Sequence, residues 1–237
     1  MFNPRPTIRV VPLPDKEHLV IVDDLLLEPH KMVELARQSR ADFSDADHNY
    51  FPGPELNLPP ALTQAFDQFI VTHVRKPLGA RRTSMLAARL ALATLQPPQL
   101  QNLQRVCHRD TVPRPGMEGT GAMVLYLFHD TRLGGTGFFR QTCSDAAFTD
   151  MVLRARAMER DAFTALTGAG PGYAVASDRY FEKVYTAQPA WNRAIFYPGT
   201  VLHSADIHHP ELLVDDVQSG RLTVNAFFNL RRNAAVA

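Results

Sequence analysis

The sequence predicts a mainly β fold with added helices. Short segments rich in β-branched and aromatic residues, such as 121–128 and 222–230, recur through the second half of the chain, and this composition is typical of strands. Proline and glycine clusters separate these segments from one another. Two other stretches, 61–73 and 147–167, place apolar residues at helical spacing and predict amphipathic helices.

The first third of the chain predicts one strand and two helices. Residues 18–23 form an apolar run that indicates a strand. A helix should follow, opened by Pro29 at a first-turn position. Residues 49–60 contain four prolines and one glycine, so we expect a loop there without regular structure. The apolar face of 61–73 would then lie against the strands.

Further strands are expected after residue 120. Segment 121–128 is apolar except for Tyr126. A buried tyrosine hydroxyl needs a hydrogen-bond partner, and either a ligand carboxylate or a backbone carbonyl would serve. The helical stretch 147–167 is an insertion between strands. The remaining strands are expected at 181–186, 192–197, 201–204 and 222–230.

The last of these strands has two different faces at a period of two residues. One face would carry Leu222, Val224, Ala226 and Phe228, and the other Arg221, Thr223 and Asn225. A strand that keeps a charged and hydroxylated face among apolar residues is suited to bind an anion. Arg221 is therefore a candidate anion-binding residue.

A short motif, His108-Arg109-Asp110, contains the candidate metal ligands. On an extended segment the side chains of His108 and Asp110 point to the same side, whereas Cys107 and Arg109 point away. His203 follows a turn and begins a short apolar strand. Two imidazoles and one carboxylate can hold Fe(II) on one face and leave the opposite face open. Cys107 is expected to be a small packing residue.

The ordered set His108-x-Asp110, His203 and Arg221 resembles the Fe(II)/2-oxoglutarate-dependent dioxygenases. The segment Gly134–Phe139 is similar to the GGxTxF strand of the prolyl-hydroxylase-like branch of that superfamily. The resemblance covers about the last two thirds of the chain, and an uncharacterised bacterial subgroup matches more of it. It implies that His108, Asp110 and His203 are the catalytic metal ligands.

The resemblance also implies a fold and a domain organisation. The family has a double-stranded β-helix, or jelly-roll, core, and a chain of 237 residues commonly forms one such domain. Residues 1–82 would support the core with a strand and helices. Residues 83–237 would form the core itself, with 147–167 as a helical insertion. Segment 85–95 fits a helix or a strand on its residues alone, and the family comparison favours a strand.

The implied co-substrate is 2-oxoglutarate. It would chelate the iron through its 2-oxo acid, while Arg221 holds its far carboxylate with help from Thr223 or Tyr126. A guanidinium presents a planar fork of donors that fits a carboxylate at two points. If another cation has this role, Arg193 is the next candidate. The connection 206–220 makes the interval between the distal histidine and this arginine 18 residues, longer than is usual in the family.

The implied reaction is hydroxylation of an unidentified small-molecule or peptide substrate. The halogenases of this family replace the carboxylate of the motif by glycine or alanine, whereas this chain keeps Asp110. The substrate itself is not encoded in a recognisable way. Two loops that could decide it, 49–60 and 112–119, contain no code for protein, amino acid, lipid or nucleobase.

Other functions fit less well. The His108–Asp110 motif also begins a kinase catalytic loop, but that loop needs an asparagine where this chain has Pro115. His208 and His209 are neighbours in a polar connection and are expected to be exposed rather than ligands. Zinc suits the same nitrogen and oxygen ligands as iron. The alternative function is a cupin-like, jelly-roll ligand-binding protein without turnover.

Composition narrows the partners and the location. The net charge of +1, with both signs spread along the chain, provides no large electrostatic field that would attract nucleic acid or an anionic membrane. No apolar run has the length of a signal peptide core or a membrane span. We therefore expect a cytoplasmic protein. Two cysteines, Cys107 and Cys143, are too few for a disulfide scaffold. Nothing in the sequence indicates an oligomeric state.

Overall fold

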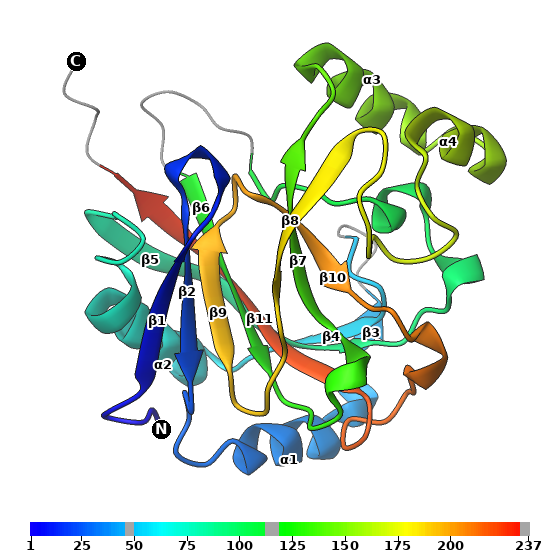
Figure 1. Cartoon of the computed structure of the whole chain (residues 1–237). Helices are drawn as coiled ribbons and strands as arrows, with labels where there is room; N and C mark the ends of the chain where they lie inside the picture. Colours follow the sequence, from blue (N-terminus) through cyan, green and yellow to red (C-terminus); the bar gives the residue numbers. More distant parts are fainter. Residues whose placement is uncertain (46–49, 112–118, 233–237) are drawn as a thin grey trace, which may run out of the picture.

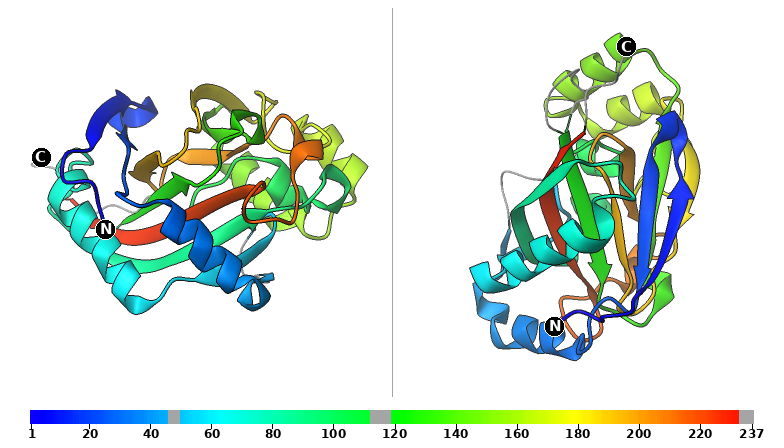
Figure 2. Two further views of the ribbon diagram at one scale, coloured as in Figure 1. Left: turned by 90° about the horizontal axis from the view of Figure 1, so that it is seen from below. Right: turned by 90° about the vertical axis from the view of Figure 1, so that its left-hand side faces the viewer.

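A computed structural model describes residues 1–45, 50–111 and 119–232 of the chain. Within these residues, two antiparallel sheets face each other, with helices on the outer side of the larger sheet and at one end of the smaller sheet (Figures 1 and 2). The predicted loop 112–119 lies outside the described residues except for Gly119, which begins a strand. Residue 49 of the other predicted loop is also outside them.

The larger sheet has eight strands in the order β1-β2-β9-β6-β11-β5-β4-β3. These strands are β1 (Thr7–Pro12), β2 (His18–Asp23), β3 (Ser44–Asp45), β4 (Pro54–Asn57), β5 (Arg82–Ala93), β6 (Gly119–Tyr126), β9 (Ala194–Pro198) and β11 (Arg221–Arg231). The long strands β5 and β11 pair along their whole length, with one irregularity beside Phe227. They form the floor on which the site is built.

The smaller sheet has the strand order β10-β7-β8. It consists of β7 (Gly135–Gln141), β8 (Phe181–Ala187) and β10 (Leu202–Asp206). An isolated antiparallel bridge between His108 and His203 extends this sheet beyond β10. The chain alternates between the sheets, from β5 to the His108 bridge, to β6, to β7 and β8, to β9, to β10 and finally to β11. This topology is the jelly roll that the sequence predicts.

Four α-helices complete the described fold: α1 (His30–Gln38), α2 (Pro60–Phe69), α3 (Asp145–Ala155) and α4 (Arg160–Thr167). Helix α2 continues as a π-helix over Ile70–Val74. Helices α1 and α2 lie on the outer side of the large sheet, whereas α3 and α4 lie at the small sheet (Figures 1 and 2). None of the helices in the described part combines the length and apolar character that crossing a membrane requires.

The two faces of β11 agree with the prediction. Its residues Leu222, Val224, Ala226 and Phe228 are buried in the core between the large sheet and helices α1 and α2. The opposite face of the strand points between the two sheets, where Arg221 and Asn225 line a cavity. A second core, which includes Ile195 from the large sheet and Phe138 from the small one, fills the rest of this space. Burial of the outer face thus fixes which residues of β11 face inward.

The prediction of a structureless loop at 49–60 is wrong. Strand β4 lies within this range and pairs Glu55 with Ala91 and Asn57 with Arg89 of β5. The prolines do not prevent this pairing because Pro54 is only the first residue of the strand and the other three lie outside it. Strand β1, which pairs with β2, was not predicted either.

The helical insertion is two helices rather than one. The chain leaves the helical conformation between Ala155 and Arg160, with Glu159 extended. The side-chain amide of Asn102 donates to the carbonyls of Ala155 and Met158, at 3.0 and 2.8 Å. Those carbonyls would otherwise accept hydrogen bonds from the next helical turn. The contact with Asn102 therefore explains the break that helical periodicity did not reveal.

Candidate functional site

His108 and Asp110 lie on an extended segment that is pinned to the edge of the small sheet. The amide of His108 donates to the carbonyl of His203 at 3.0 Å, and the reverse bond is 2.9 Å. The amide of Asp110 donates to the carbonyl of Gly199 at 2.8 Å. A Cβ atom at Gly199 would lie 2.9 Å from the carbonyl oxygen of Thr120 and 3.0 Å from the Cβ of Asp110. Only glycine leaves room for this close approach.

The neighbours of the two ligand candidates point the other way, as predicted. Cys107 is buried in the core on the outer side of the small sheet, and this burial raises the pKa of its thiol. The guanidinium of Arg109 lies 5.4 Å from the centre of the Phe148 ring on α3. Cys107 is therefore a packing residue and not a ligand. The alternation leaves His108 and Asp110 together on the cavity side.

His203 is held with its Nε2 atom available. Its Nδ1 atom lies 3.0 Å from the carbonyl oxygen of Val201, so Nδ1 carries the proton and donates it to that oxygen. The ring of Tyr197 packs beside the imidazole, with centroids 4.7 Å apart. Burial lowers the pKa of His203 to about 4, which keeps the ring neutral at pH 7. A neutral imidazole with a free Nε2 lone pair is the form that binds a metal.

The three side chains converge as a group that could hold a metal ion. One ligand atom from each of His108, Asp110 and His203 lies within 4.8 Å of the others. Oδ1 of Asp110 is 3.7 Å from Nε2 of both histidines. Oδ2 of Asp110 is buried and has no hydrogen-bond partner among the described residues, and burial raises the pKa of this carboxyl group. A buried carboxylate with an unused oxygen between two neutral imidazoles fits a cation.

The group opens into a cavity of about 520 Å³ between the sheets. Residues from both sheets and from the segments around them line this cavity, among them His108, Asp110, His203, Thr136, Tyr173 and Arg221. The candidate metal ligands and the candidate anion-binding arginine therefore share one space, as the sequence predicts.

Arg221 is a buried cation, 3% exposed, at the start of β11. Its Nε and Nη2 atoms donate to the carbonyls of Gly134 and Gly135, at 3.1 and 2.9 Å. In the described part of the chain it has no ion-pair partner, and burial lowers the pKa of its guanidinium. Gly134 has φ of 85°, and a Cβ there would lie 2.2 Å from the carbonyl oxygen of Asp206. The Gly-Gly sequence is thus what brings these carbonyls to Arg221.

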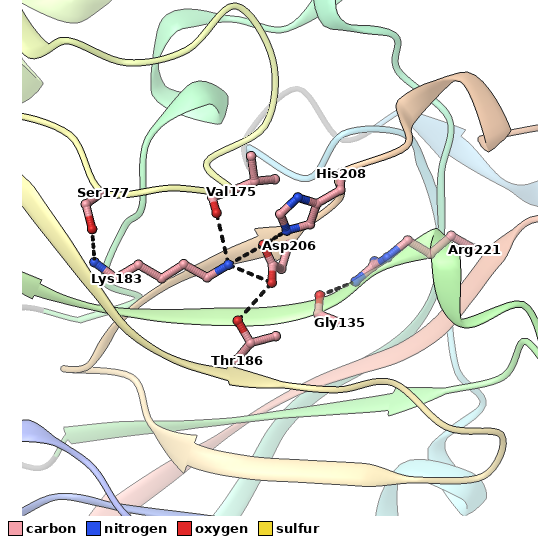
Figure 3. A network of polar contacts seen from close by, with 8 residues as sticks. All are labelled: Gly135, Val175, Ser177, Lys183, Thr186, Asp206, His208 and Arg221. Atoms are coloured by element: carbon pink, nitrogen blue, oxygen red, sulfur yellow. Dashed lines mark hydrogen bonds and ion pairs between the residues drawn. The ribbon is translucent and has the colours of Figure 1, made fainter.

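The carboxylate of Asp206, whose charge acts on Arg221, is already engaged by other groups. Asp206 accepts hydrogen bonds from Lys183 Nζ at 2.7 and 2.8 Å and from Thr186 Oγ1 at 2.9 Å, and His208 Nε2 lies 3.1 Å away (Figure 3). Lys183 also donates to the carbonyl of Val175 at 3.0 Å. Asp206 is therefore neutralised by its own partners. Arg221 keeps an uncompensated positive charge beside the cavity.

Tyr126 and Thr223, the predicted helpers of Arg221, lie on the inner side of the large sheet behind the cavity wall. The hydroxyl of Tyr126 is 2.8 Å from Oγ1 of Thr136, and this side chain lines the cavity. In the described structure the partner of the tyrosine hydroxyl is thus a side-chain hydroxyl and not a backbone carbonyl. Oγ1 of Thr223 lies 3.1 Å from Oδ1 of Asn225. Neither predicted helper is among the residues that line the cavity in the described structure.

Two other predictions concern residues away from the site. Arg193, the second candidate for the anion, instead forms an ion pair with Asp23 and donates to the carbonyl of Gln188 at 2.9 Å. His208 and His209 are exposed, as expected, and each contacts a carboxylate of its own connection. The structure also brings into the cavity Arg89 and Glu55, which sequence reasoning missed.

Comparison with known protein families assigns the chain to one family. Residues 4–228 match a family described as a family of unknown function, DUF6445. The chain belongs to DUF6445. A comparison of this DUF6445 chain with curated proteins found no match.

Solved structures similar to this DUF6445 chain include a prolyl-4-hydroxylase of Pseudomonas putida. The two chains are 14% identical, with a TM-score of 0.41 and 86% of each chain covered. Another is HygX of Streptomyces hygroscopicus with nickel, 2-oxoglutarate and hygromycin B bound, at 9% identity and a TM-score of 0.47, covering 91% of this chain and 84% of HygX. At such low identity, neither structure decides the chemistry of the DUF6445 chain, which depends on its own residues.

Proposed function

We propose that this protein is a non-haem Fe(II)- and 2-oxoglutarate-dependent oxygenase that hydroxylates a small-molecule or peptide substrate. The observation that carries the proposal is a single cavity with two features. One is a His-Asp-His group whose buried carboxylate oxygen has no partner among the described residues. The other is the buried Arg221, which has no ion-pair partner among the described residues. A metal and an anionic co-substrate together match both features.

His108, Asp110 and His203 would hold the iron. When bound, Fe(II) supplies the redox chemistry that couples decarboxylation of 2-oxoglutarate to oxidation of the substrate. The protein fixes the three ligands through the backbone pair between His108 and His203 and through the bond from His203 to Val201. The Gly199 turn holds Asp110 in place. Zinc also fits these three ligands.

Arg221 would bind the far carboxylate of 2-oxoglutarate. Its two bonds to the carbonyls of Gly134 and Gly135 fix the plane of the guanidinium and leave Nη1 without a partner among the described residues. Thr136 lines the cavity, and the Tyr126 hydroxyl contacts it from behind. Tyr126 and Thr223 would thus help by positioning the groups that contact the ligand. In an enclosed site a charge-assisted pair is stronger than at the surface.

The placement in the prolyl-hydroxylase-like branch, and in a bacterial subgroup of it, is part of this proposal. The support is the Gly134–Phe139 motif, whose glycine carbonyls hold Arg221. We also propose that residues 1–237 act as one domain, with 1–82 supporting the core 83–237. The N-terminal strand β2 pairs with β9, and β4 pairs with β5, so both parts contribute to one sheet.

Anaerobic titration with Fe(II) and 2-oxoglutarate tests the metal site. The wild-type protein should develop the weak visible charge-transfer band of the iron chelate, and Zn(II) should compete without producing a band. His108→Ala and His203→Ala should lose the band. His129→Ala is a matched control, because His129 is exposed and stacks on Trp191 away from the cavity. If either ligand variant binds iron as tightly as wild type, that residue is not a ligand.

Turnover separates an oxygenase from a cupin-like binding protein. With Fe(II), ascorbate, 2-oxoglutarate and air, an oxygenase should release succinate slowly even without its substrate. A binding protein would bind the same molecules and release none. Once a substrate is known, the product should gain one oxygen atom from dioxygen. A chlorinated product would contradict the role of Asp110, because the halogenases of the family lack this carboxylate.

A further inference from the structure

One tyrosine in the cavity has a hydroxyl group that the protein itself does not use. Tyr197 on β9 is 2% exposed and lines the cavity. Its hydroxyl forms no hydrogen bond with the described residues, and protein atoms do not fully enclose the oxygen. A buried tyrosine normally directs its hydroxyl to a hydrogen-bond partner. This hydroxyl is therefore available to a molecule bound in the cavity.

The hydroxyls of three other tyrosines at the cavity all have protein partners. These pairs are Tyr50 with Nε of Arg156 at 2.7 Å, Tyr126 with Oγ1 of Thr136 at 2.8 Å, and Tyr173 with the carbonyl of Leu95 at 2.7 Å. Each of these three side chains is thus tied to the wall by its polar end. Tyr197 differs because packing alone holds it in the same wall.

The ring of Tyr197 lies beside the candidate metal ligands. It packs edge-on against Phe138 of β7, with centroids 5.1 Å apart, and its centroid is 4.7 Å from that of His203. The backbone of Tyr197 pairs with Ala122 of β6. Burial raises the pKa of Tyr197, and the nearby charge of Asp110 raises it further. The hydroxyl is thus a hydrogen-bond donor close to the His-Asp-His group.

The register of the small sheet shows how deep Tyr197 lies in the cavity. Pairing of β10 with β7 places His203 opposite Phe138. Gly135, whose carbonyl accepts from Nη2 of Arg221, lies three residues before Phe138 on β7. Three residues of a strand span about 10 Å. Because Tyr197 packs against Phe138 and His203, it lies at the level of the metal ligands and not at the level of Arg221.

In the proposed function, 2-oxoglutarate extends between these two levels. Arg221 binds the far carboxylate, which leaves the 2-oxo acid at the level of Tyr197. We infer that the Tyr197 hydroxyl donates a hydrogen bond to an oxygen atom of this 2-oxo acid. The bond orients the chelating end of the co-substrate, whereas Arg221 orients the opposite end. This inference rests on the proposed binding of 2-oxoglutarate, and it adds a binding residue that the family resemblance does not assign.

The test is Tyr197→Phe, which removes only the hydroxyl and keeps the ring that packs against His203 and Phe138. The ligand-free variant should be as stable as wild type in urea unfolding, because the hydroxyl has no protein partner to lose. Its affinity for Fe(II) alone should also be unchanged. In anaerobic titration with Fe(II), its affinity for 2-oxoglutarate should fall at least about tenfold, because a hydrogen bond to a charged acceptor is lost.

The visible band of the iron chelate provides a second readout, which a purely structural role would not change. A hydrogen bond to the 2-oxo acid lowers the energy of the orbital that accepts the electron in this charge-transfer transition. At saturating 2-oxoglutarate, the chelate of Tyr197→Phe should therefore absorb at a shorter wavelength than that of wild type. Tyr180→Phe is the matched control, because Tyr180 is buried in the core on the outer side of the small sheet. It should match wild type in both affinity and band position.

The outcomes separate this inference from the proposed function. If wild type forms the chelate and Tyr197→Phe forms it with the same affinity and the same band, the inference is wrong and the oxygenase proposal stands. A loss of affinity without a band shift would place the hydroxyl away from the 2-oxo acid and would also overturn the inference. If wild type forms no chelate, both are wrong.

Two further results complete the test. If the expected loss and shift occur but wild type releases no succinate, the inference holds and the protein binds 2-oxoglutarate without turnover. Circular dichroism detects unfolding of Tyr197→Phe. In that case Tyr197→Met, which also lacks the hydroxyl, is measured in the same way against the same expected loss of affinity and band shift.

Discussion

Arg105 and Arg221 are both buried arginines, 2% and 3% exposed, and neither has an ion-pair partner among the described residues. Arg105 ends a short 3₁₀-helix and reaches into the helical insertion. There its three nitrogens meet only neutral acceptors, including the carbonyl of Gly170 at 2.8 Å and the hydroxyl of Thr164 at 2.6 Å. Nη1 is also used, with Asn102 Oδ1 at 3.3 Å.

Arg221 has fewer partners and a different setting. Two of its nitrogens are used, both by backbone carbonyls, and it lines the cavity that contains the His-Asp-His group. Arg105 does not line that cavity. Burial alone is therefore not a sign of ligand binding, because Arg105 shows that neutral groups can fully satisfy a buried guanidinium. Arg221 differs from Arg105 in two ways: its Nη1 has no partner among the described residues, and its side chain lines the cavity.

The largest effect is expected at Arg221. Arg221→Met should weaken 2-oxoglutarate binding by on the order of 2–5 kcal/mol, because the buried co-substrate carboxylate would lose its cation. Iron affinity should be spared, since Arg221 contacts none of the metal ligands. Anaerobic titration of each ligand measures both. Unchanged 2-oxoglutarate affinity would remove the distinction between the two arginines and leave Arg89 as the cation to test.

A somewhat smaller effect is expected at Arg105, and on stability instead of binding. Arg105→Met should lower the free energy of unfolding by about 3 kcal/mol, because several buried acceptors lose their donor at ~1–3 kcal/mol each. Urea unfolding measures this change. The folded variant should bind 2-oxoglutarate like wild type. A loss of binding in this variant, with stability intact, would contradict the structural role.

Ligand-induced stabilisation sharpens the comparison further. At a 2-oxoglutarate concentration of 100 times its dissociation constant, binding to the folded state alone stabilises it by about 2.7 kcal/mol. Thermal unfolding under nitrogen with Fe(II) should show this gain in wild type and in Arg105→Met. Arg221→Met should show little of it at the same concentration. Equal gains in all three proteins would argue against Arg221 as the binding residue.

The smallest effect is expected at Arg193, the cation first considered as the substitute for Arg221. Its ion pair with Asp23 lies outside the cavity and is partly exposed. Arg193→Gln should therefore lower stability by about 1 kcal/mol or less and leave 2-oxoglutarate affinity unchanged. The same calorimetric titration checks this. A clear loss of 2-oxoglutarate affinity would mean that the anion binds elsewhere than beside Arg221.

Local pattern was enough to predict the directions of His108, Asp110 and Arg221, which meet in the cavity. Alternation fixed the direction of His108 and Asp110 because their segment is extended. It also fixed the face of Arg221, because the other face of β11 is buried under helices. The distances between these residues depend instead on pairing across the fold. The bridge between His108 and His203 joins segments that no local pattern relates.

The missed features are those in which tertiary contacts outweigh local composition. The proline content of 49–60 concealed β4, and with it the inward position of Glu55 beside Arg89. The partner of Tyr126 was missed because Thr136 belongs to the opposite sheet. In both cases the decisive neighbour is distant in sequence. The inward position of Arg89 could have been predicted from the sequence, because Arg89 alternates with alanines and would therefore be a polar side chain on a face of small residues.

The connection between β10 and β11 bears on how related chains are recognised. Its 3₁₀-helix at Pro210–Leu212 and the turn that ends at Gly220 lie between two strands whose registers are set independently, β10 by β7 and β11 by β5 and β6. Residues can thus be added or removed there without moving His203 or Arg221. A sequence pattern for such proteins should therefore allow any length between His203 and Arg221. It should also require Gly134 and Gly135, whose carbonyls accept hydrogen bonds from Arg221.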